Sequence, residues 1–226
     1  IPSEMWEQVN RFYLMVRDAV TRGMSHHDLH AFLADVKAAS HLLWGITDAT
    51  MSHGEGWHFA RLGRLLERAD KTSRILDVKY FILLPTADEV GTPFDIIQWS
   101  DLLKSASALE MYYKRYGRIA PDDVAAFLIL EPTFPRAIRY CLINAEVSLH
   151  AISGSERGSY QSLAEKRLGR LRAELDFVDI EDCVTRGLHE FVDHFQARLN
   201  QVGEAISETF FVPRRVHYTE SVTEEQ

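Results

Sequence analysis

The sequence predicts an all-α protein, an antiparallel bundle of about seven or eight helices without a β-sheet. Apolar residues recur at the 3.6-residue helical period along most of the chain, and no segment shows the alternation typical of a strand. The 226 residues include only 12 glycines and 7 prolines, most of them between amphipathic segments or near their ends. Because 46% of the residues are hydrophobic, the chain has enough apolar material for a core.

The first half of the chain is predicted to form three helices. Ser3 is a suitable N-cap for the first, whose apolar residues fall on one face. Ser25 and Asp28 form a weak capping pair before the second. The third is longer, is interrupted early by Gly54 and Gly56, and is stopped by a proline. The predicted helices cover residues 3–23, 29–45 and 51–84.

The second half is predicted to form five more helices, three of which begin at a proline. Pro93, Pro121 and Pro135 suit the first helical position, where the missing backbone N–H has no intrahelical partner. All eight helices are expected to form one domain over residues 1–213, followed by a polar tail over residues 214–226. The five helices cover residues 93–116, a short segment from 121, 135–152, 160–175 and 180–211.

Charge and cysteine content exclude several classes of function. The chain has 25 Lys and Arg against 33 Asp and Glu, a formal net charge of −8, so we expect no nucleic-acid partner. No apolar segment is long enough to cross a membrane, and we expect no membrane partner. Cys141 and Cys183 cannot form a disulfide framework and are expected to be buried and inert. A reducing cytoplasm is the expected location.

A charged stripe on the predicted helix over residues 51–84 is the first candidate site. Glu67, Asp70, Arg74 and Asp77 lie beside the apolar face. Surface ion pairs within the helix, Glu67 with Lys71 and Asp70 with Arg74, would account for them. The alternative is that the carboxylates and arginines bind a charged ligand such as a peptide terminus, because the Arg fork matches a carboxylate. The candidate binding residues are Glu55, Trp57, Arg64, Glu67, Arg68, Asp70, Arg74 and Asp77.

Metal ligation and standard enzyme motifs have little support. Glu55 and His58 have the Glu-x-x-His spacing of di-iron helical bundles, but those bundles need a second such motif and the chain has none. His189 and His194 are five residues apart, whereas two histidine ligands of one zinc on a helix need a spacing of four. No nucleophile elbow, phosphate-binding loop or dinucleotide motif is present. We therefore expect no metal site and no cofactor.

Several short segments combine into a specific pattern. They are Thr50-Met51-Ser52-His53-Gly54-Glu55-Gly56-Trp57, Leu62-Gly63-Arg64, Leu66-Glu67-Arg68-Ala69-Asp70, Thr72 and Arg74-Ile75-Leu76-Asp77-Val78. The pattern continues through Tyr116-Gly117-Arg118, Phe134-Pro135 and Leu168-Gly169-Arg170-Leu171, so it covers nearly the whole chain. It closely resembles the bacterial alpha-E domain family, an all-helical domain named for a Glu-Arg signature, here Glu67-Arg68.

The resemblance implies a functional context more than a reaction. Alpha-E proteins tend to be encoded beside circularly permuted ATP-grasp proteins and transglutaminase-like proteins, which implies a peptide or amide ligation and processing system. We therefore expect a helical accessory component that binds a peptide or a partner protein, an ATP-grasp ligase or a transglutaminase-like protein. The alternative is an enzyme of that system, a hydrolase or ligase with Glu55 or Glu67 as general acid/base. Family members are longer and carry an earlier Glu-Arg helix, so the chain is expected to be either the C-terminal part of such a member or a short member.

Overall fold

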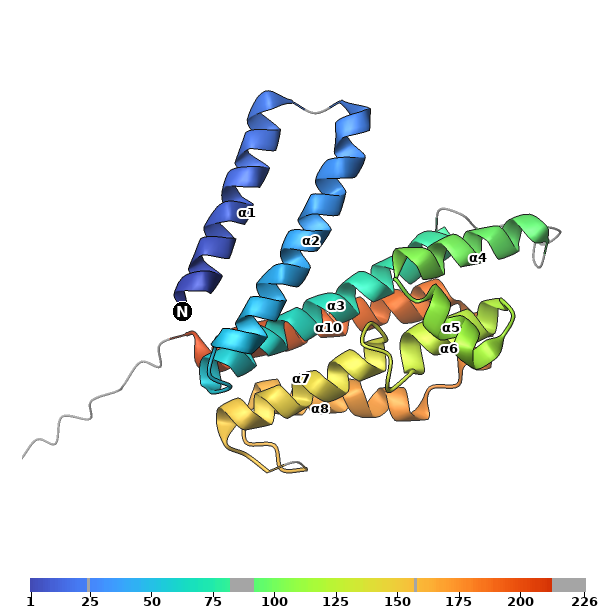
Figure 1. Ribbon diagram of the computed structural model, residues 1–226. Coiled ribbons are helices and arrows are strands. Elements are labelled where there is room, and N and C mark those ends of the chain that lie inside the picture. The colour runs from blue at the N-terminus through green and yellow to red at the C-terminus, as the bar shows by residue number, and fades with distance from the viewer. Residues whose placement is uncertain (24, 82–91, 157, 213–226) are drawn as a thin grey trace, which may run out of the picture. The chain divides into compact units, whose positions relative to one another are not determined.

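The computed structural model describes residues 1–23, 25–81, 92–156 and 158–212. Within these ranges the chain contains ten α-helices and a short 3-10 helix, η2, and it has no strand (Figure 1). The predicted all-α class is confirmed.

The chain forms two compact units, Ile1–Arg61 and Leu62–Gln226. The predicted tail over residues 214–226 lies outside the described residues. In the described residues, no helix combines the length and the apolar character that crossing a membrane requires.

The number of helices was predicted too low because two predicted helices are each divided. The predicted helix over residues 93–116 breaks near Ser107, which has a φ of +51°. The predicted helix over residues 180–211 breaks at Gly187, which has a φ of +118°. A residue with positive φ cannot continue a right-handed helix. The resulting helices are α4 (Pro93–Ser105), α5 (Leu109–Tyr116), α9 (Ile180–Arg186) and α10 (Leu188–Phe210).

The first unit contains a helical hairpin of α1 (Ser3–Arg22) and α2 (His26–Thr50), which pack against each other. The side chain of Gln8 donates a hydrogen bond from Nε2 to the carbonyl oxygen of Ala39 at 3.4 Å. Ser25 and Asp28 form the predicted capping box at the start of α2. The hairpin is therefore held by a cap at its turn and by packing along its length.

The second unit is built from most of α3 (Glu55–Phe81) and all later helices. Helix α8 packs against both α7 and α10, and α6 packs against α7 and α9. The ion pairs Arg172–Glu146 and Arg139–Asp176 join α7 to α8 and to η2, which follows it. The paired residue numbers run in opposite directions, so α7 and α8 are antiparallel as predicted. The remaining elements are α6 (Pro121–Leu130), α7 (Ile138–Ser153), α8 (Leu163–Glu174) and η2 (Leu175–Phe177).

Helix α3 contributes one continuous face to the core of the second unit. Leu62, Leu65, Ala69 and Leu76 are each at most 2% exposed and lie in one hydrophobic cluster with residues from α4 to α10. Leu66 packs against this cluster but is only half-buried. Burial of this face positions the charged stripe of α3 at the edge of the core.

Candidate functional site

All eight residues predicted to bind a ligand lie on α3, and the boundary between the two units divides this helix after Arg61. Glu55 and Trp57 lie in the first unit. The Glu55 side chain is exposed. The Trp57 indole stacks on the His53 imidazole with ring centroids 4.1 Å apart, and the Arg61 guanidinium carbon lies 5.5 Å from the indole centroid. These contacts hold Trp57 within its own unit, and the other six predicted residues lie in the second unit.

Arg68 and Thr72 hold the turn that precedes α7. Arg68 Nη1 donates a hydrogen bond to the Pro135 carbonyl oxygen at 3.3 Å, and Thr72 Oγ1 donates one to the Arg136 carbonyl oxygen at 2.7 Å. Both donors lie on the same face of α3 because they are four residues apart. The prediction that a helix begins at Pro135 was wrong: α7 begins at Ile138, and the preceding turn uses its carbonyl groups to contact α3.

Three guanidinium groups gather beside this turn. Burial raises the pKa of the Cys141 thiol to about 12, although the positive charges of Arg68, Arg136 and Arg64 all act to lower it. Burial also lowers the pKa of Arg136, and the positive charge of Arg68 lowers it further. Arg68 and Cys141 both contact the Pro135 carbonyl oxygen. Arg136 is the next residue in the chain, and Arg64 lies one helical turn before Arg68, so the three arginines lie near the Cys141 thiol. We refer to Arg64, Arg68 and Arg136 as the arginine cluster.

The chemistry of Cys141 at this point is passive. A thiol with a pKa near 12 stays protonated at neutral pH, and nucleophilic attack requires the thiolate. Its sulfur donates to the Pro135 carbonyl oxygen at 3.5 Å. The predicted burial is confirmed for Cys141, whereas Cys183 is half-buried. Sequence reasoning missed Arg136, since the one local signal, a proline followed by an arginine, was interpreted as a helix start.

Glu67 adds an accessible carboxylate next to the arginine cluster. It is exposed, and Arg64 lies three residues before it, a spacing that makes side chains neighbours on a helix surface. Glu67 forms no ion pair with another described residue, and the predicted pair with Lys71 is not formed, because Lys71 Nζ lies 3.7 Å from Asp70 Oδ2 instead. The enzymatic alternative requires a carboxylate pressed against apolar surroundings, and the exposed Glu67 lacks them.

The other three predicted residues are engaged within the protein. Arg74 Nε donates to Asp70 Oδ2 at 2.8 Å, which confirms the predicted i,i+4 pair, and this hydrogen bond raises the pKa of Arg74. His189 Nδ1 on α10 donates to Asp77 Oδ1 at 2.5 Å, and this hydrogen bond raises the pKa of His189. Asp77 therefore links α3 to α10, and Asp70 and Arg74 neutralise each other on the surface.

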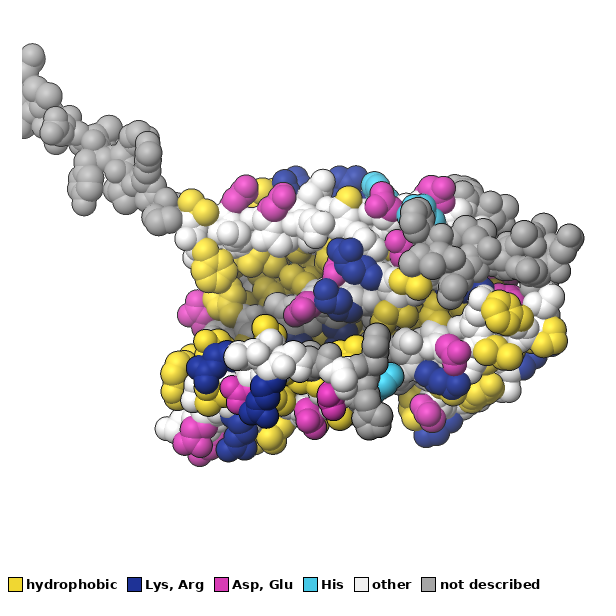
Figure 2. Space-filling view, turned by 90° about the horizontal axis from the view of Figure 1, so that it is seen from above, with side chains coloured by type: hydrophobic (Ala, Val, Ile, Leu, Met, Phe, Trp, Pro, Cys, Tyr) yellow, Lys and Arg dark blue, Asp and Glu magenta, His cyan; other side chains and the backbone are white. Residues whose placement is uncertain are grey.

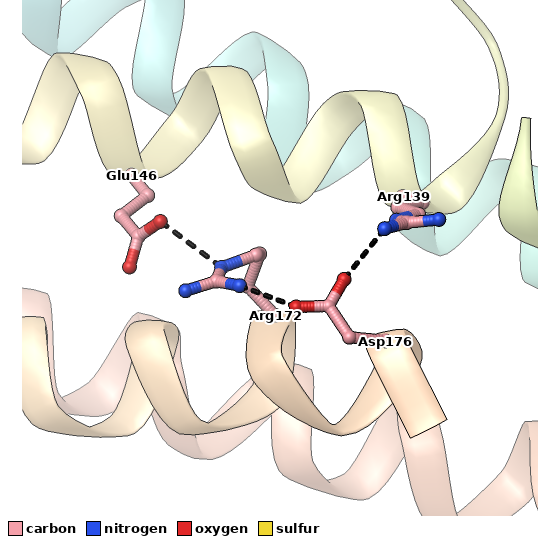
Figure 3. A network of polar contacts seen from close by, with 4 residues as sticks. All are labelled: Arg139, Glu146, Arg172 and Asp176. Atoms are coloured by element: carbon pink, nitrogen blue, oxygen red, sulfur yellow. Dashed lines mark hydrogen bonds and ion pairs between the residues drawn. The ribbon is translucent and has the colours of Figure 1, made fainter. Parts of the chain in front are cut away.

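A second charged group of residues joins α7 to α8 and to η2, which follows α8 (Figure 3). Arg172 donates from Nε to Glu146 at 3.1 Å and from Nη1 to Asp176 at 2.6 Å. Arg139 Nη2 donates to the other oxygen of Asp176 at 2.7 Å. These side chains border a hollow of about 370 Å³, which Tyr160 also lines. Because both carboxylates are already paired with arginines, the network acts as a clamp between the two helices.

In the part of the chain that the structure describes, no group of three or more His, Cys, Asp or Glu side chains is placed to hold a metal ion.

A family model described as "A predicted alpha-helical domain with a conserved ER motif" matches residues 1–211. The chain belongs to the Alpha-E family. Glu-Arg occurs twice in this Alpha-E chain, at residues 67–68 and 156–157, and the first pair lies at the arginine cluster. No match was found among curated proteins or among solved structures.

Proposed function

We propose that this Alpha-E chain is an accessory, non-catalytic component that binds a carboxylate of a peptide or partner protein at the arginine cluster. It acts in the bacterial ATP-grasp-linked peptide ligation and processing system that the resemblance implies, with an ATP-grasp ligase and a transglutaminase-like protein as partners. The observation that carries the proposal is that Arg68 and the buried Cys141 thiol contact the same Pro135 carbonyl oxygen, so that Arg68, Arg136 and Arg64 lie near one another beside the exposed carboxylate of Glu67.

Electrostatics support an anionic ligand at this cluster. Neither Arg68 nor Arg136 forms an ion pair with another described residue, although each is half-buried. Guanidinium groups held close together repel one another, and an anion bound between them relieves this repulsion. A carboxylate suits the position because it accepts two parallel hydrogen bonds from one guanidinium fork. Glu67 accepts a hydrogen bond from an amine or amide of the same ligand. A peptide carries both a carboxylate for the arginines and an N–H donor for Glu67.

Co-purification tests the proposal. The wild-type chain and a circularly permuted ATP-grasp protein from the same genome are co-expressed, and the chain is captured through an affinity tag. We expect the ATP-grasp protein to be retained by the wild type and lost from the Arg68→Gln/Arg136→Gln double variant. Glutamine removes both charges, and its amide can still donate to the Pro135 carbonyl oxygen that Arg68 contacts.

A matched control separates charge from local structure. Thr72→Val removes the hydrogen bond to the Arg136 carbonyl oxygen and leaves every arginine in place. Retention by Thr72→Val together with loss from the double variant supports binding by the arginine cluster. Equal retention by the double variant and the wild type would refute the assignment of the site. Equal loss from Thr72→Val would show that the turn, not the charge, is recognised.

A further inference from the structure

A groove between α8 and α10 collects basic side chains. It has a volume of about 460 Å³ and lies entirely within the second unit. Five of its seven lining residues are Lys, Arg or His, and the complete lining is Leu163, Lys166, Arg167, Arg170, His194, Arg198 and Gln201. We refer to it as the basic groove. It shares no residue with the arginine cluster.

Helical spacing explains why these residues meet. Those of α8 follow the spacing i, i+3, i+4 and i+7, and those of α10 follow i, i+4 and i+7, so each set lies on one face of its helix. Arg167 Nη1 donates to the Gln201 carbonyl oxygen at 2.8 Å, and Arg198 donates to Glu174. Because 167 pairs with 201 and 174 with 198, the helices are antiparallel and their basic faces form the two sides of the groove.

The concentration of positive charge is unusual for this chain. The whole chain has a formal net charge of −8, and on the face that Figure 2 shows, Lys and Arg side chains lie among Asp and Glu side chains. The basic groove contains no acidic lining residue. Lys166 is exposed, and the side chain of Arg170 is 75% exposed. An incoming ligand can therefore reach at least these two cations directly.

Two arginines of the basic groove, Arg170 and Arg198, already bind a carboxylate within the protein. Glu174 accepts hydrogen bonds from both Arg198 and Arg170, the latter at 3.3 Å. Burial acts to raise the pKa of Glu174, but the hydrogen bonds and charges of Arg198 and Arg170 bring it below its ordinary value. A carboxylate that contacts two lining residues of the groove is thus stabilised by one arginine from each helix.

We propose that the basic groove binds an acidic peptide segment of a partner protein, with its carboxylates between the cationic rows of α8 and α10. The lining row on α8 runs from Leu163 to Arg170, seven steps of about 1.5 Å along the helix or about 10 Å, and its cations are Lys166, Arg167 and Arg170. That length matches about three residues of an extended peptide or two turns of an acidic helix. A single small anion would engage only part of such a row, and a nucleic acid would meet the acidic remainder of the surface.

Fluorescence anisotropy with a fluorescein-labelled hexaglutamate peptide tests this proposal on the complete chain at low ionic strength. We expect saturable binding of hexaglutamate, no saturable binding of a hexaglutamine peptide, and weak competition by inorganic phosphate. The Lys166→Glu/Arg170→Glu variant should bind about tenfold more weakly or worse, because both accessible cations are reversed. Competition by inorganic phosphate or a single-stranded DNA as effective as that by unlabelled hexaglutamate would overturn the assignment to a peptide.

Lys114→Glu/Arg118→Glu is the matched control, because it makes the same change in net charge at two exposed residues outside the groove. We expect it to bind hexaglutamate within about twofold of the wild type. Equal weakening by both variants would show that only net charge matters and would overturn the proposal, as would the absence of binding to the wild type. The Arg68→Gln/Arg136→Gln variant should retain hexaglutamate binding, so failure of the arginine-cluster proposal is distinguishable from failure of this one.

Discussion

Replacing Lys79 by methionine should destabilise the second unit by about 3 to 5 kcal/mol, because it breaks an ion pair that is removed from solvent. Lys79 Nζ lies 2.7 Å from Asp95 Oδ1, and both side chains are 3% exposed. The same ammonium group donates to Gln98 Oε1 at 2.6 Å and lies 5.4 Å from the centroid of the Trp99 ring. These contacts join the end of α3 to the start of α4.

The magnitude follows from what the substitution leaves behind. Methionine fills much of the lysine volume, so the main cost is the Asp95 carboxylate, which stays buried without its cation. A typical domain has about 5 to 15 kcal/mol of stability, so the variant loses a large fraction of it. Replacing both partners, as Lys79→Met/Asp95→Leu, should recover most of the loss because no buried charge remains. Gln98 still loses a donor, which costs about 1 to 3 kcal/mol if it becomes buried without a partner.

Urea denaturation followed by circular dichroism measures the free energy of unfolding of the wild type, the single variant and the double variant. Amide hydrogen exchange in α4 provides a local readout, and protection there should fall in Lys79→Met and return in the double variant. A Lys79→Met variant within about 1 kcal/mol of the wild type would refute the reasoning, since that is the range of an exposed pair. A double variant less stable than the single one would refute it equally.

Three further predictions concern α3. Leu76→Ala should lower the free energy of unfolding, measured by urea denaturation, by about 2 to 5 kcal/mol. Leu66→Ala should lower it less, because Leu66 is half-buried whereas Leu76 is 0% exposed. Equal losses would contradict the assigned core face. Gly63→Ala should stabilise the chain by about 0.5 to 1 kcal/mol, because an added Cβ would meet no atom within 4 Å apart from the adjoining residues and the backbone of its own helix. A lower Tm would show that the space is occupied. Asp77→Asn should lower the pKa of His189 in an NMR titration, since their hydrogen bond raises it. A raised histidine pKa stabilises the fold fully below the unfolded value of about 6.5 and ceases to do so as the pH rises through the folded value. The stability difference between wild type and Asp77→Asn should therefore shrink as the pH increases from about 6 to about 8, and a difference that grows would contradict the pairing.

The helical period was sufficient to predict the fold class and most helices, because burying one face of a helix demands apolar residues at fixed intervals. It did not predict where helices break. Gly187 carried a signal for its break, as glycine favours positive φ, but Ser107 adopts a φ of +51° without any such signal. Pro135 misled the prediction in the opposite way, since a proline suits both a helix start and the turn in which it lies.

Helical spacing predicted one of the two ion pairs expected along α3 and none of the contacts between α3 and other elements. The Asp70–Arg74 pair was predicted because residues four apart on a helix are neighbours. The partner of Asp77, His189, is 112 residues away, and no periodicity in one helix specifies what packs against it. The contact of Arg68 with the Pro135 carbonyl oxygen is hidden for the same reason. The structure therefore narrows the candidate site to the part of the stripe next to the arginine cluster.

The tripeptide Leu-Gly-Arg shows how one local sequence can lead to different surroundings. It occurs as Leu62-Gly63-Arg64 on α3 and as Leu168-Gly169-Arg170 on α8. Residues two apart on a helix lie about 160° apart around its axis, so burial of each leucine directs the arginine away from the face that the leucine occupies. Both leucines are at most 1% exposed, and one arginine belongs to the arginine cluster while the other lines the basic groove. The glycines differ, because a Cβ at Gly169 would lie 2.5 Å from a ring carbon of Tyr160 whereas one at Gly63 would meet nothing within 4 Å. The tripeptide thus places an arginine at the edge of each core face. Whether a residue larger than glycine fits next to that arginine depends on the element that packs against the helix.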